Sequence, residues 1–221
     1  MAFKWFDFTD LNIMRIEEIP FAVSKSVYPP REDSWLLAQS IPKIGGKKCL
    51  DMGCGSGIQT AAMLLNGAER VTSVDKHEDA LSAAKQNLSS HFDLNKVEFV
   101  ISDLFQNIKG SYDFMVFNPP YVPTPEMKWS DTDGGKKGRE VIDKFLDQFH
   151  LFLSPEGTCY LLQSSRNSLT LTQAKAREVG FSCNIVALQD VPGEELQVLR
   201  LQREVLAQEE EEPQTPSNYY S

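Results

Sequence analysis

The chain has 221 residues, 31 acidic and 22 basic, so its formal net charge at pH 7 is −9. This length fits one domain with flanking segments, and a hydrophobic share of 41% is enough for an ordinary buried core. The composition excludes collagen, coiled coils and wholesale disorder, and the sequence has no run of about 18 apolar residues that would predict a membrane-spanning helix. The acidic balance argues against direct DNA binding, because neutralising phosphates requires clustered Lys and Arg.

The four cysteines and three histidines show no spacing typical of a zinc site. Cys49, Cys54, Cys159 and Cys183 include no C-x-x-C pair. We therefore expect no metal site, and we expect reduced, partly buried thiols of an intracellular protein. The first twenty residues mix charged and apolar side chains and contain no signal-peptide core, so we expect the cytoplasm, with the nucleus as the alternative.

Three segments are expected along the chain. Residues 1–26 form an N-terminal extension, residues 27–206 form the folded domain and residues 207–221 form an acidic, disordered tail. The tail has four consecutive glutamates and no Val, Ile, Leu or Phe, so it cannot bury enough apolar surface to fold alone.

Within the folded domain, short apolar strands alternate with amphipathic helices. In chain order the patterns predict a strand over 48–52, a helix over 56–65, a strand over 70–74, a helix over 78–88, strands over 97–101 and 113–117, a helix over 142–153, a strand over 158–162, a helix over 169–179 and strands over 182–188 and 196–201. This alternation predicts an α/β fold in which helices cover both faces of a mostly parallel sheet.

A glycine-rich loop follows the first predicted strand and leads into a helix. Its sequence is Asp51-Met-Gly53-Cys-Gly55-Ser-Gly57. Glycines let a backbone turn tightly and approach a ligand closely. The dinucleotide fingerprint G-x-G-x-x-G would need a further glycine where Ile58 or Thr60 stands, so the spacing argues against NAD binding.

Acidic residues follow the next two predicted strands. Asp75 closes the second strand, where a carboxylate can accept both hydroxyls of a ribose, and Asp103 follows the third, where a carboxylate could accept from an adenine amino group. A lone Asp is more often a solvated loop residue or a helix cap. Asp51, Asp75 and Asp103 at three successive strand ends favour instead a nucleoside with a neutral or cationic tail, since three carboxylates would repel phosphates.

With these features the chain resembles the class I S-adenosylmethionine-dependent methyltransferases. The resemblance implies a Rossmann-like, seven-stranded, mostly parallel sheet whose last strand is antiparallel. It also implies S-adenosylmethionine as cofactor and S-adenosylhomocysteine as product. Gly53 and Gly55 would pass beside the methionine part of the cofactor. Asp75 would hold the ribose, and Asp103 would face the adenine.

The tetrapeptide Asn118-Pro119-Pro120-Tyr121 follows the fourth predicted strand. Two prolines fix the backbone and remove two N–H donors, so the carbonyls of Asn118 and Pro119 and the Asn118 side chain can accept both hydrogens of a planar NH2 group. Tyr121 can stack on the flat face of that group. This grip would orient the nitrogen lone pair toward a methyl group and stabilise the positive charge that develops on transfer. The alternative is a Pro-Pro loop that only closes a strand.

The same tetrapeptide is used to methylate either adenine N6 or the side-chain amide of a glutamine. Two further segments indicate which of the two target classes applies. They are Tyr28-Pro-Pro-Arg-Glu-Asp-Ser34 upstream and Gly134-Gly-Lys-Lys-Gly-Arg139 downstream. Together with the tetrapeptide they resemble the HemK-type release-factor glutamine methyltransferases, most closely the eukaryotic and archaeal branch. The resemblance implies methyl transfer to the glutamine of the Gly-Gly-Gln motif of a class 1 release factor. It sets Asp33 and Ser34 near the cofactor and Asn118 to Tyr121 on the target glutamine.

That branch also resembles proteins that work as obligate partners of a small zinc-ribbon activator, so the resemblance implies a heterodimer. An exposed apolar edge strand would be the docking feature, and residues 97–101 are the candidate. The alternative is that this strand is covered by its own domain.

The segment 128–139 borders the predicted site and contains three glycines. We expect a mobile, substrate-facing loop in which Lys136, Lys137 and Arg139 meet an acidic target surface or RNA. A solvated loop whose glycines only make turns is the comparable alternative.

Three alternatives to glutamine methylation stay open from the sequence. Relatives of this branch are linked to a histone lysine target, which would have to be deprotonated, with Tyr121 or water as the base. Adenine N6 methylation would require base extrusion and a basic track. The third alternative is a catalytically idle scaffold subunit, against which the intact acids and Asn118 count.

Overall fold

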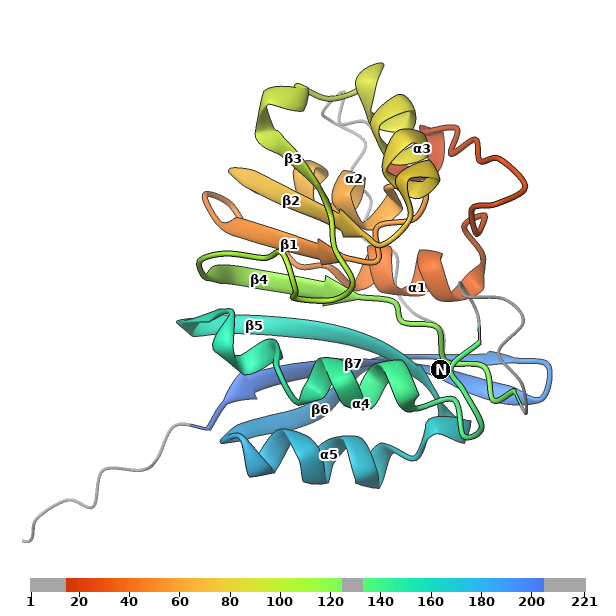
Figure 1. Ribbon diagram of the computed structural model, residues 1–221, viewed down its shortest axis with the longest axis vertical. Helices are drawn as coiled ribbons and strands as arrows, with labels where there is room; N and C mark the ends of the chain where they lie inside the picture. The colour runs from red at the N-terminus through yellow and green to blue at the C-terminus, as the bar shows by residue number, and fades with distance from the viewer. Residues whose placement is uncertain (1–14, 125–132, 205–221) are drawn as a thin grey trace, which may run out of the picture.

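The computed structural model describes residues 15–124 and 133–204, and its centre is one seven-stranded sheet (Figure 1). The strands are β1 (Lys48–Met52), β2 (Arg70–Asp75), β3 (Val97–Ile101), β4 (Tyr112–Phe117), β5 (Leu153–Ser164), β6 (Phe181–Val191) and β7 (Glu194–Arg203). Their order across the sheet is β3-β2-β1-β4-β5-β7-β6. β7 runs antiparallel to both of its neighbours, and the other adjacent pairs are parallel. The predicted fold class, with its antiparallel last strand, is therefore confirmed.

Helices cover both faces of the sheet (Figure 1). The helices are α1 (Glu32–Ser40), α2 (Ile58–Leu65), α3 (Glu78–Ser89), α4 (Glu140–Leu146) and α5 (Leu169–Glu178), with 3-10 turns η1 (Ile16–Glu18), η2 (Leu94–Lys96), η3 (Phe149–Leu151) and η4 (Ser165–Asn167). α1 and α2 pack on one face, and α4 lies beside α5 on the other. The predicted acidic tail, residues 1–14 of the predicted extension and residues 128–132 of the predicted loop lie outside the described residues.

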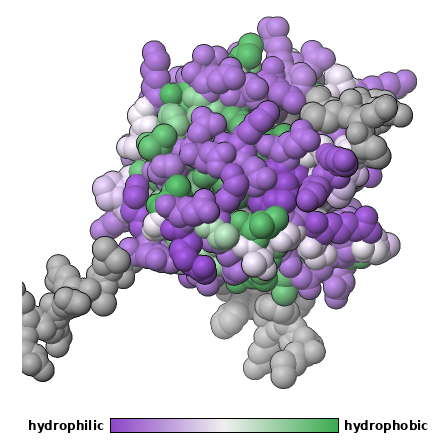
Figure 2. Space-filling model, turned by 60° about the horizontal axis from the view of Figure 1, so that its bottom comes forward, coloured by the Kyte–Doolittle hydropathy of each residue, from purple (hydrophilic) through white to green (hydrophobic). Residues whose placement is uncertain are grey.

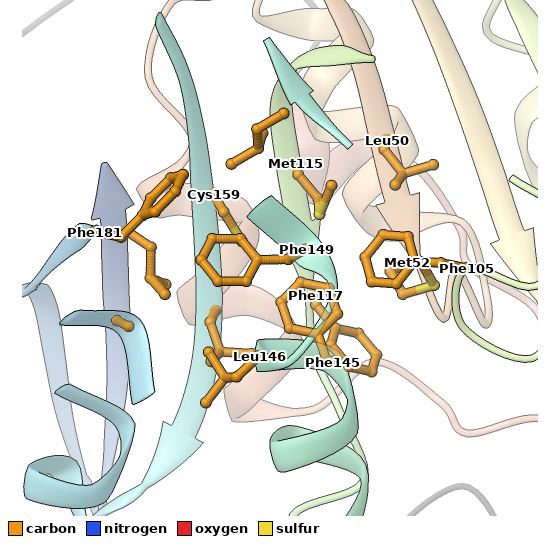
Figure 3. Packing of buried hydrophobic residues seen from close by; sticks show 14 of the residues in the cluster. Leu50, Met52, Phe105, Met115, Phe117, Phe145, Leu146, Phe149, Cys159 and Phe181 are labelled. Atoms are coloured by element: carbon orange, nitrogen blue, oxygen red, sulfur yellow. The ribbon is translucent and has the colours of Figure 1, made fainter. Parts of the chain in front are cut away.

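The alternation of side chains along the central strands divides the core into two clusters. In β1, Leu50 joins the cluster under α4 and α5, whereas Cys49 joins the cluster under α1 and α2. Figure 3 shows the first cluster, in which Phe117 at the end of β4 packs on Phe145 of α4 with ring centroids 4.7 Å apart. This contact holds the carboxyl end of β4, and with it the tetrapeptide that follows, against α4.

Several boundaries differ from the prediction by one to three residues, and β5 begins at Leu153 instead of residue 158. The largest differences concern the end of α4 and the presence of α1. The helix predicted over 142–153 ends at Leu146, and the chain passes through η3 before β5 begins at Leu153. Phe149 is fully buried against Phe145 and Phe181, so its apolar character marks a tight turn into the core rather than a longer helix. The sequence analysis also assigned no helix to the segment that forms α1.

The chain preceding α1 packs against the domain. Ile19 is buried with Ala61 of α2 and Leu88 of α3. The backbone of Ala22 donates to and accepts from the Asn87 side chain at 3.1 and 2.9 Å. Residues from the end of the predicted extension thus pack on α2 and α3 of the domain.

Most of the face shown in Figure 2 is hydrophilic, with hydrophobic side chains in small separate areas. Among the residues that the structure describes, none of the helices has the length and apolar character needed to cross a bilayer. The four cysteines are buried and unbonded to one another. The same described ranges hold no group of three or more His, Cys, Asp or Glu residues that could bind a metal ion.

Candidate active site

A cavity of about 1140 Å³, part of it open to solvent, lies beyond the carboxyl ends of β1, β2 and β4. This is where open α/β sheets bind ligands. Nine of the predicted site residues line it, namely Ser34, Gly53, Gly55, Asp75, Asp103, Asn118, Pro119, Pro120 and Tyr121. The tenth, Asp51, lies beneath the glycine loop and does not line the wall. The structure therefore brings together at one site the residues that the sequence had spread over nearly ninety positions.

The glycine loop needs its glycines for backbone conformation and for space. Gly53 has a φ of +66°, and a Cβ there would meet the Phe117 ring at 3.2 Å. Gly57 has a φ of +86°, and its Cβ would lie 3.1 Å from Ala84 of α3. A side chain at either position would be strained, and it would push the loop away from β4 at Gly53 and away from α3 at Gly57. The loop keeps these close contacts only with glycine.

Asp75 at the end of β2 is oriented by backbone donors. Its Oδ2 accepts from the Gly55 N–H at 3.1 Å, and its Oδ1 accepts from the His77 N–H at 3.0 Å. A carboxylate has about four acceptor positions, and Asp75 lines the cavity, where ribose hydroxyls could donate to it. The contact with Gly55 also links the carboxylate to the glycine loop, which fixes their relative positions.

Asp103 lies on an exposed turn after β3. The buried Ser102 hydroxyl shapes this turn by donating to the Leu104 carbonyl at 2.8 Å and accepting from the Asn107 N–H at 2.9 Å. Leu104 adopts a φ of +49°, which non-glycine residues rarely do. The turn thus holds Asp103 at the rim of the cavity, 28 positions along the chain from Asp75.

Asp51 supports the loop from below. Its Oδ2 accepts from the Thr60 hydroxyl at 2.7 Å, and that hydroxyl lies 2.6 Å from the Ser73 hydroxyl. Its Oδ1 has no hydrogen-bond partner among the described residues. Burial, partly offset by the bonds from Thr60, raises the pKa of this carboxyl to about 7.

The Asp51→Asn variant is expected to gain stability over the parent protein as the pH rises from 4 to 7. The unfolded chain releases this proton near the usual pKa of 3.8, whereas the folded protein holds it until about pH 7. Ionisation therefore favours the unfolded state across that window, by up to roughly 4 kcal/mol, and the difference levels off at higher pH. Urea unfolding of both proteins at pH 4, 5.5, 7 and 8 measures it. A difference in the free energy of unfolding that does not change with pH would contradict the raised pKa.

Asp33 is the centre of the hydrogen bonds at the other end of the cavity. Asp33 is 4% exposed, and its carboxylate accepts from the Ser34 N–H at 2.7 Å and from the Asn118 Nδ2 at 3.1 Å. The hydroxyls of Tyr28 and Tyr121 approach it at 3.3 and 3.4 Å. Because Asn118 must present its NH2 to this carboxylate, its Oδ1 is turned the other way. That oxygen is buried and has no partner among the described residues, and Asn118 itself lines the cavity.

The two tyrosines around Asp33 remain protonated at neutral pH. Burial, followed by the negative charge of Asp33, raises the pKa of Tyr121 above its ordinary value of 10. The same two causes raise the pKa of Tyr28. Both hydroxyls therefore act as hydrogen-bond donors, and Tyr121 is not available as a general base.

A second network fixes the backbone that follows the tetrapeptide. Asn167, in η4, is fully buried and donates to the carbonyls of Tyr121 and Gly138 at 2.8 and 3.0 Å. The Arg139 guanidinium donates to the Asn167 carbonyl, to the Thr172 hydroxyl at 2.9 Å and to Asp143 at 2.7 Å. The sequence analysis missed Asn167. No local sequence pattern indicates this role, because 46 positions separate Asn167 from Tyr121.

The expectation for Arg139 was wrong. Its side chain is 7% exposed and pairs with Asp143 within the domain, so it does not meet a target surface or RNA. Lys136 and Lys137 are exposed. The described part of the glycine segment is held in place, because the Gly134 N–H donates to the Val122 carbonyl at 2.9 Å and Gly138 packs on the tetrapeptide.

Gly138→Ala is expected to lower activity by tenfold or more while cofactor affinity changes little. A Cβ at Gly138 would lie 2.2 Å from the Tyr121 carbonyl oxygen, so the tetrapeptide must move, and a misplacement of about 1 Å can cost about a hundredfold in rate. Gly180→Ala is the matched control, since its φ is +79° but a Cβ there meets nothing within 4 Å. Steady-state kinetics would compare the two variants. Equal activity in both would show that the contact with Tyr121 does not position the site.

Comparison with known proteins identifies the family to which the chain belongs. The family model of the methyltransferase small domain matches residues 31–170. A Methanocaldococcus jannaschii protein, provisionally named protein N5-glutamine methyltransferase, is 37% identical over 86% of this chain and 99% of its own length. Methyltransferase HEMK2 of Mus musculus is 29% identical over 81% of this chain and 91% of its own.

A solved structure gives the same result. The Mtq2–Trm112 complex of E. cuniculi, described as responsible for methylation of the eRF1 translation termination factor, superposes with a TM-score of 0.64 at 28% identity and covers 81% of this chain and 99% of the matched chain. The chain therefore belongs to the methyltransferase small domain family, as a member of the HemK-type glutamine methyltransferases that its sequence resembles.

Proposed function

We propose that this protein is an S-adenosylmethionine-dependent enzyme that methylates the side-chain amide of the glutamine in the Gly-Gly-Gln motif of a translation release factor. The observation that carries the proposal is the state of Asn118. Its amide is anchored by Asp33, and its Oδ1 is buried at the cavity wall with no partner among the described residues. Such an oxygen can accept a hydrogen of a substrate NH2 group.

The residues around the cavity fit S-adenosylmethionine. Asp75 presents a carboxylate that can accept from ribose hydroxyls, Asp103 stands at the rim for the adenine, and the glycine loop leaves room for close approach. When bound, the cofactor supplies a methyl group on a positively charged sulfur and leaves as S-adenosylhomocysteine. The names of the relatives support the same assignment.

The chain's own residues would orient the target nitrogen. Asn118 Oδ1 and the Pro119 carbonyl accept the two amide hydrogens, which directs the nitrogen lone pair away from them and toward the cavity. Positive charge that grows on the amide is stabilised by these oxygens and by the Asp33 carboxylate behind Asn118. Tyr121 closes the side of the pocket, with its hydroxyl held by Asp33. The proton can leave after attack, so the site needs no strong base.

The protonation state of Tyr121 favours an amide over a lysine. A lysine side chain arrives as an ammonium and must lose a proton before it can attack. Burial and Asp33 raise the pKa of Tyr121, which prevents it from taking that proton at neutral pH. An amide nitrogen carries no such proton and needs only orientation.

A partner subunit is part of the proposal, because the similar Mtq2 is found in a complex with Trm112. We expect a small zinc-ribbon activator to dock at β3, which forms one edge of the sheet. Ile101 at its end is 51% exposed, whereas Phe99 packs against the α2–α3 region of the same domain. A release-factor substrate would place the enzyme in the cytoplasm.

The test compares release factors that differ only at the target residue. The protein, co-expressed with the activator, is incubated with methyl-labelled S-adenosylmethionine and a release factor carrying Gly-Gly-Gln, Gly-Gly-Asn or Gly-Gly-Lys. Label is expected on the Gly-Gly-Gln protein and in at most trace amounts on the other two. Preferred labelling of the lysine protein would replace the proposal with lysine methylation.

A further inference from the structure

A second residue of the cavity wall, Gln59, carries a buried acceptor with no partner among the described residues, and the function proposed above does not use it. Gln59 lies in the first turn of α2, directly after the glycine loop, and is 3% exposed. Its Nε2 donates to the Ser34 carbonyl at 2.9 Å. Because a carbonyl can only accept, this contact identifies the NH2 end of the side chain and leaves Oε1 as the other end. Oε1 is buried and has no partner among the described residues.

An unpartnered buried oxygen is costly, and most buried polar atoms in folded proteins are hydrogen-bonded. Gln59 cannot relieve the cost by rotating its amide, since that would set Oε1 against the Ser34 carbonyl oxygen. Gln59 lines the same cavity as Asp75 and Asn118. A ligand that fills this cavity is therefore the natural source of a donor.

A continuous line of contacts shows which end of the cavity Gln59 faces. Asn118 donates to Asp33, Asp33 accepts from Ser34, and Ser34 accepts from Gln59. Gln59 is thus linked to the Asn118 end of the cavity. With the ribose at Asp75 and the adenine at the rim, the amino-acid part of the cofactor occupies the Gln59 end.

The chemistry of that amino-acid part selects one group. Its α-carboxylate has acceptors only and would be repelled by a carbonyl oxygen, whereas its α-ammonium has three donors. The Asp33 carboxylate nearby already receives donors from four residues. We propose that Gln59 Oε1 accepts a hydrogen bond from the α-ammonium group of S-adenosylmethionine and so fixes the amino-acid end of the cofactor. This inference rests on the proposed function.

The test compares two ligands on each variant. S-adenosylhomocysteine carries the α-amino group, and its deaminated analogue has hydrogen in that position. Dissociation constants for both are measured by calorimetry on the full chain with its activator, for the parent protein, Gln59→Leu and Gln59→Met. Gln86→Leu, which replaces an exposed glutamine on α3, is the matched control.

The parent protein and Gln86→Leu should prefer S-adenosylhomocysteine over the analogue by the same factor. In both Gln59 variants this preference should fall by about tenfold to a hundredfold, the range for a hydrogen bond to a charged group. Each ratio compares two ligands on the same variant. Any loosening of α1 caused by the lost Gln59–Ser34 hydrogen bond weakens both ligands and therefore cancels in the ratio. An unchanged ratio in both Gln59 variants, or a parent protein without preference, would overturn the inference and leave the proposed function standing. If the parent protein bound neither ligand, both would fall.

Discussion

Replacing Asn118 with alanine should reduce the rate of methyl transfer by about a hundredfold to a thousandfold. The loss of one preorganised transition-state contact has an effect of this size in other enzymes. The Oδ1 of Asn118 is a buried acceptor with no partner among the described residues, and it is the one assigned to the target amide. Its removal leaves the target NH2 group held by backbone carbonyls alone. The nitrogen then samples orientations in which its lone pair is not aimed at the methyl group.

Cofactor binding should survive this change. The residues assigned to the ribose and the adenine are Asp75 at the end of β2 and Asp103 on the turn after β3, away from the β4 tetrapeptide in sequence. Calorimetry with S-adenosylhomocysteine and single-turnover transfer to the release factor separate the two effects. Asn118→Asp is a second informative variant, because it keeps an oxygen but sets a carboxylate against Asp33, 3.1 Å from the present amide nitrogen. Normal turnover in Asn118→Ala would remove Asn118 from the mechanism.

Asp33→Asn should cause the second largest loss of activity, on the order of a hundredfold. The change is nearly isosteric, but it replaces one acceptor oxygen with an NH2 group. The surrounding groups are themselves hydrogen-bond donors, so this NH2 group cannot pair with them. Asn118, Tyr121 and the Ser34 backbone all donate to the carboxylate of Asp33. One of them must lose its acceptor, and rotation of the Asn118 amide would turn its NH2 toward the target and remove the acceptor that the reaction needs.

The neighbouring acid supplies the control for Asp33→Asn. Glu32 is exposed on the same first turn of α1, so Glu32→Gln removes the same charge without touching the network. Kinetics on both variants should show a fall in kcat only for Asp33→Asn. If the two variants behaved alike, the effect would be one of net charge rather than of hydrogen-bond geometry.

The elements that the sequence predicts well are those whose signals are local. The glycine loop, the acids at the ends of β2 and β3 and the tetrapeptide after β4 each sit at a strand end, and a parallel sheet brings those ends to one edge. The end of α4 was predicted too late because buried aromatic residues such as Phe149 continue an apolar pattern after the helix has stopped.

What the sequence does not predict depends on distant contacts. Asp33 and Asn118 are 85 positions apart, and nothing local to either residue indicates that one orients the other. The hydrogen bond from Asn167 to the Tyr121 carbonyl likewise joins residues that are far apart in the sequence. Arg139 looked like a surface cation because it follows two exposed lysines, but its guanidinium finds acceptors in η4 and α5 that only the fold supplies.

The most direct measurement is mass spectrometry of the release factor after incubation with the protein, its activator and S-adenosylmethionine. Fragmentation should locate one added methyl group on the side-chain nitrogen of the Gly-Gly-Gln glutamine, and the Asn118→Ala protein should leave that glutamine unmodified. If the glutamine stayed unmodified while the same sample bound S-adenosylhomocysteine, or if the methyl group lay on a lysine, the release-factor assignment would be wrong.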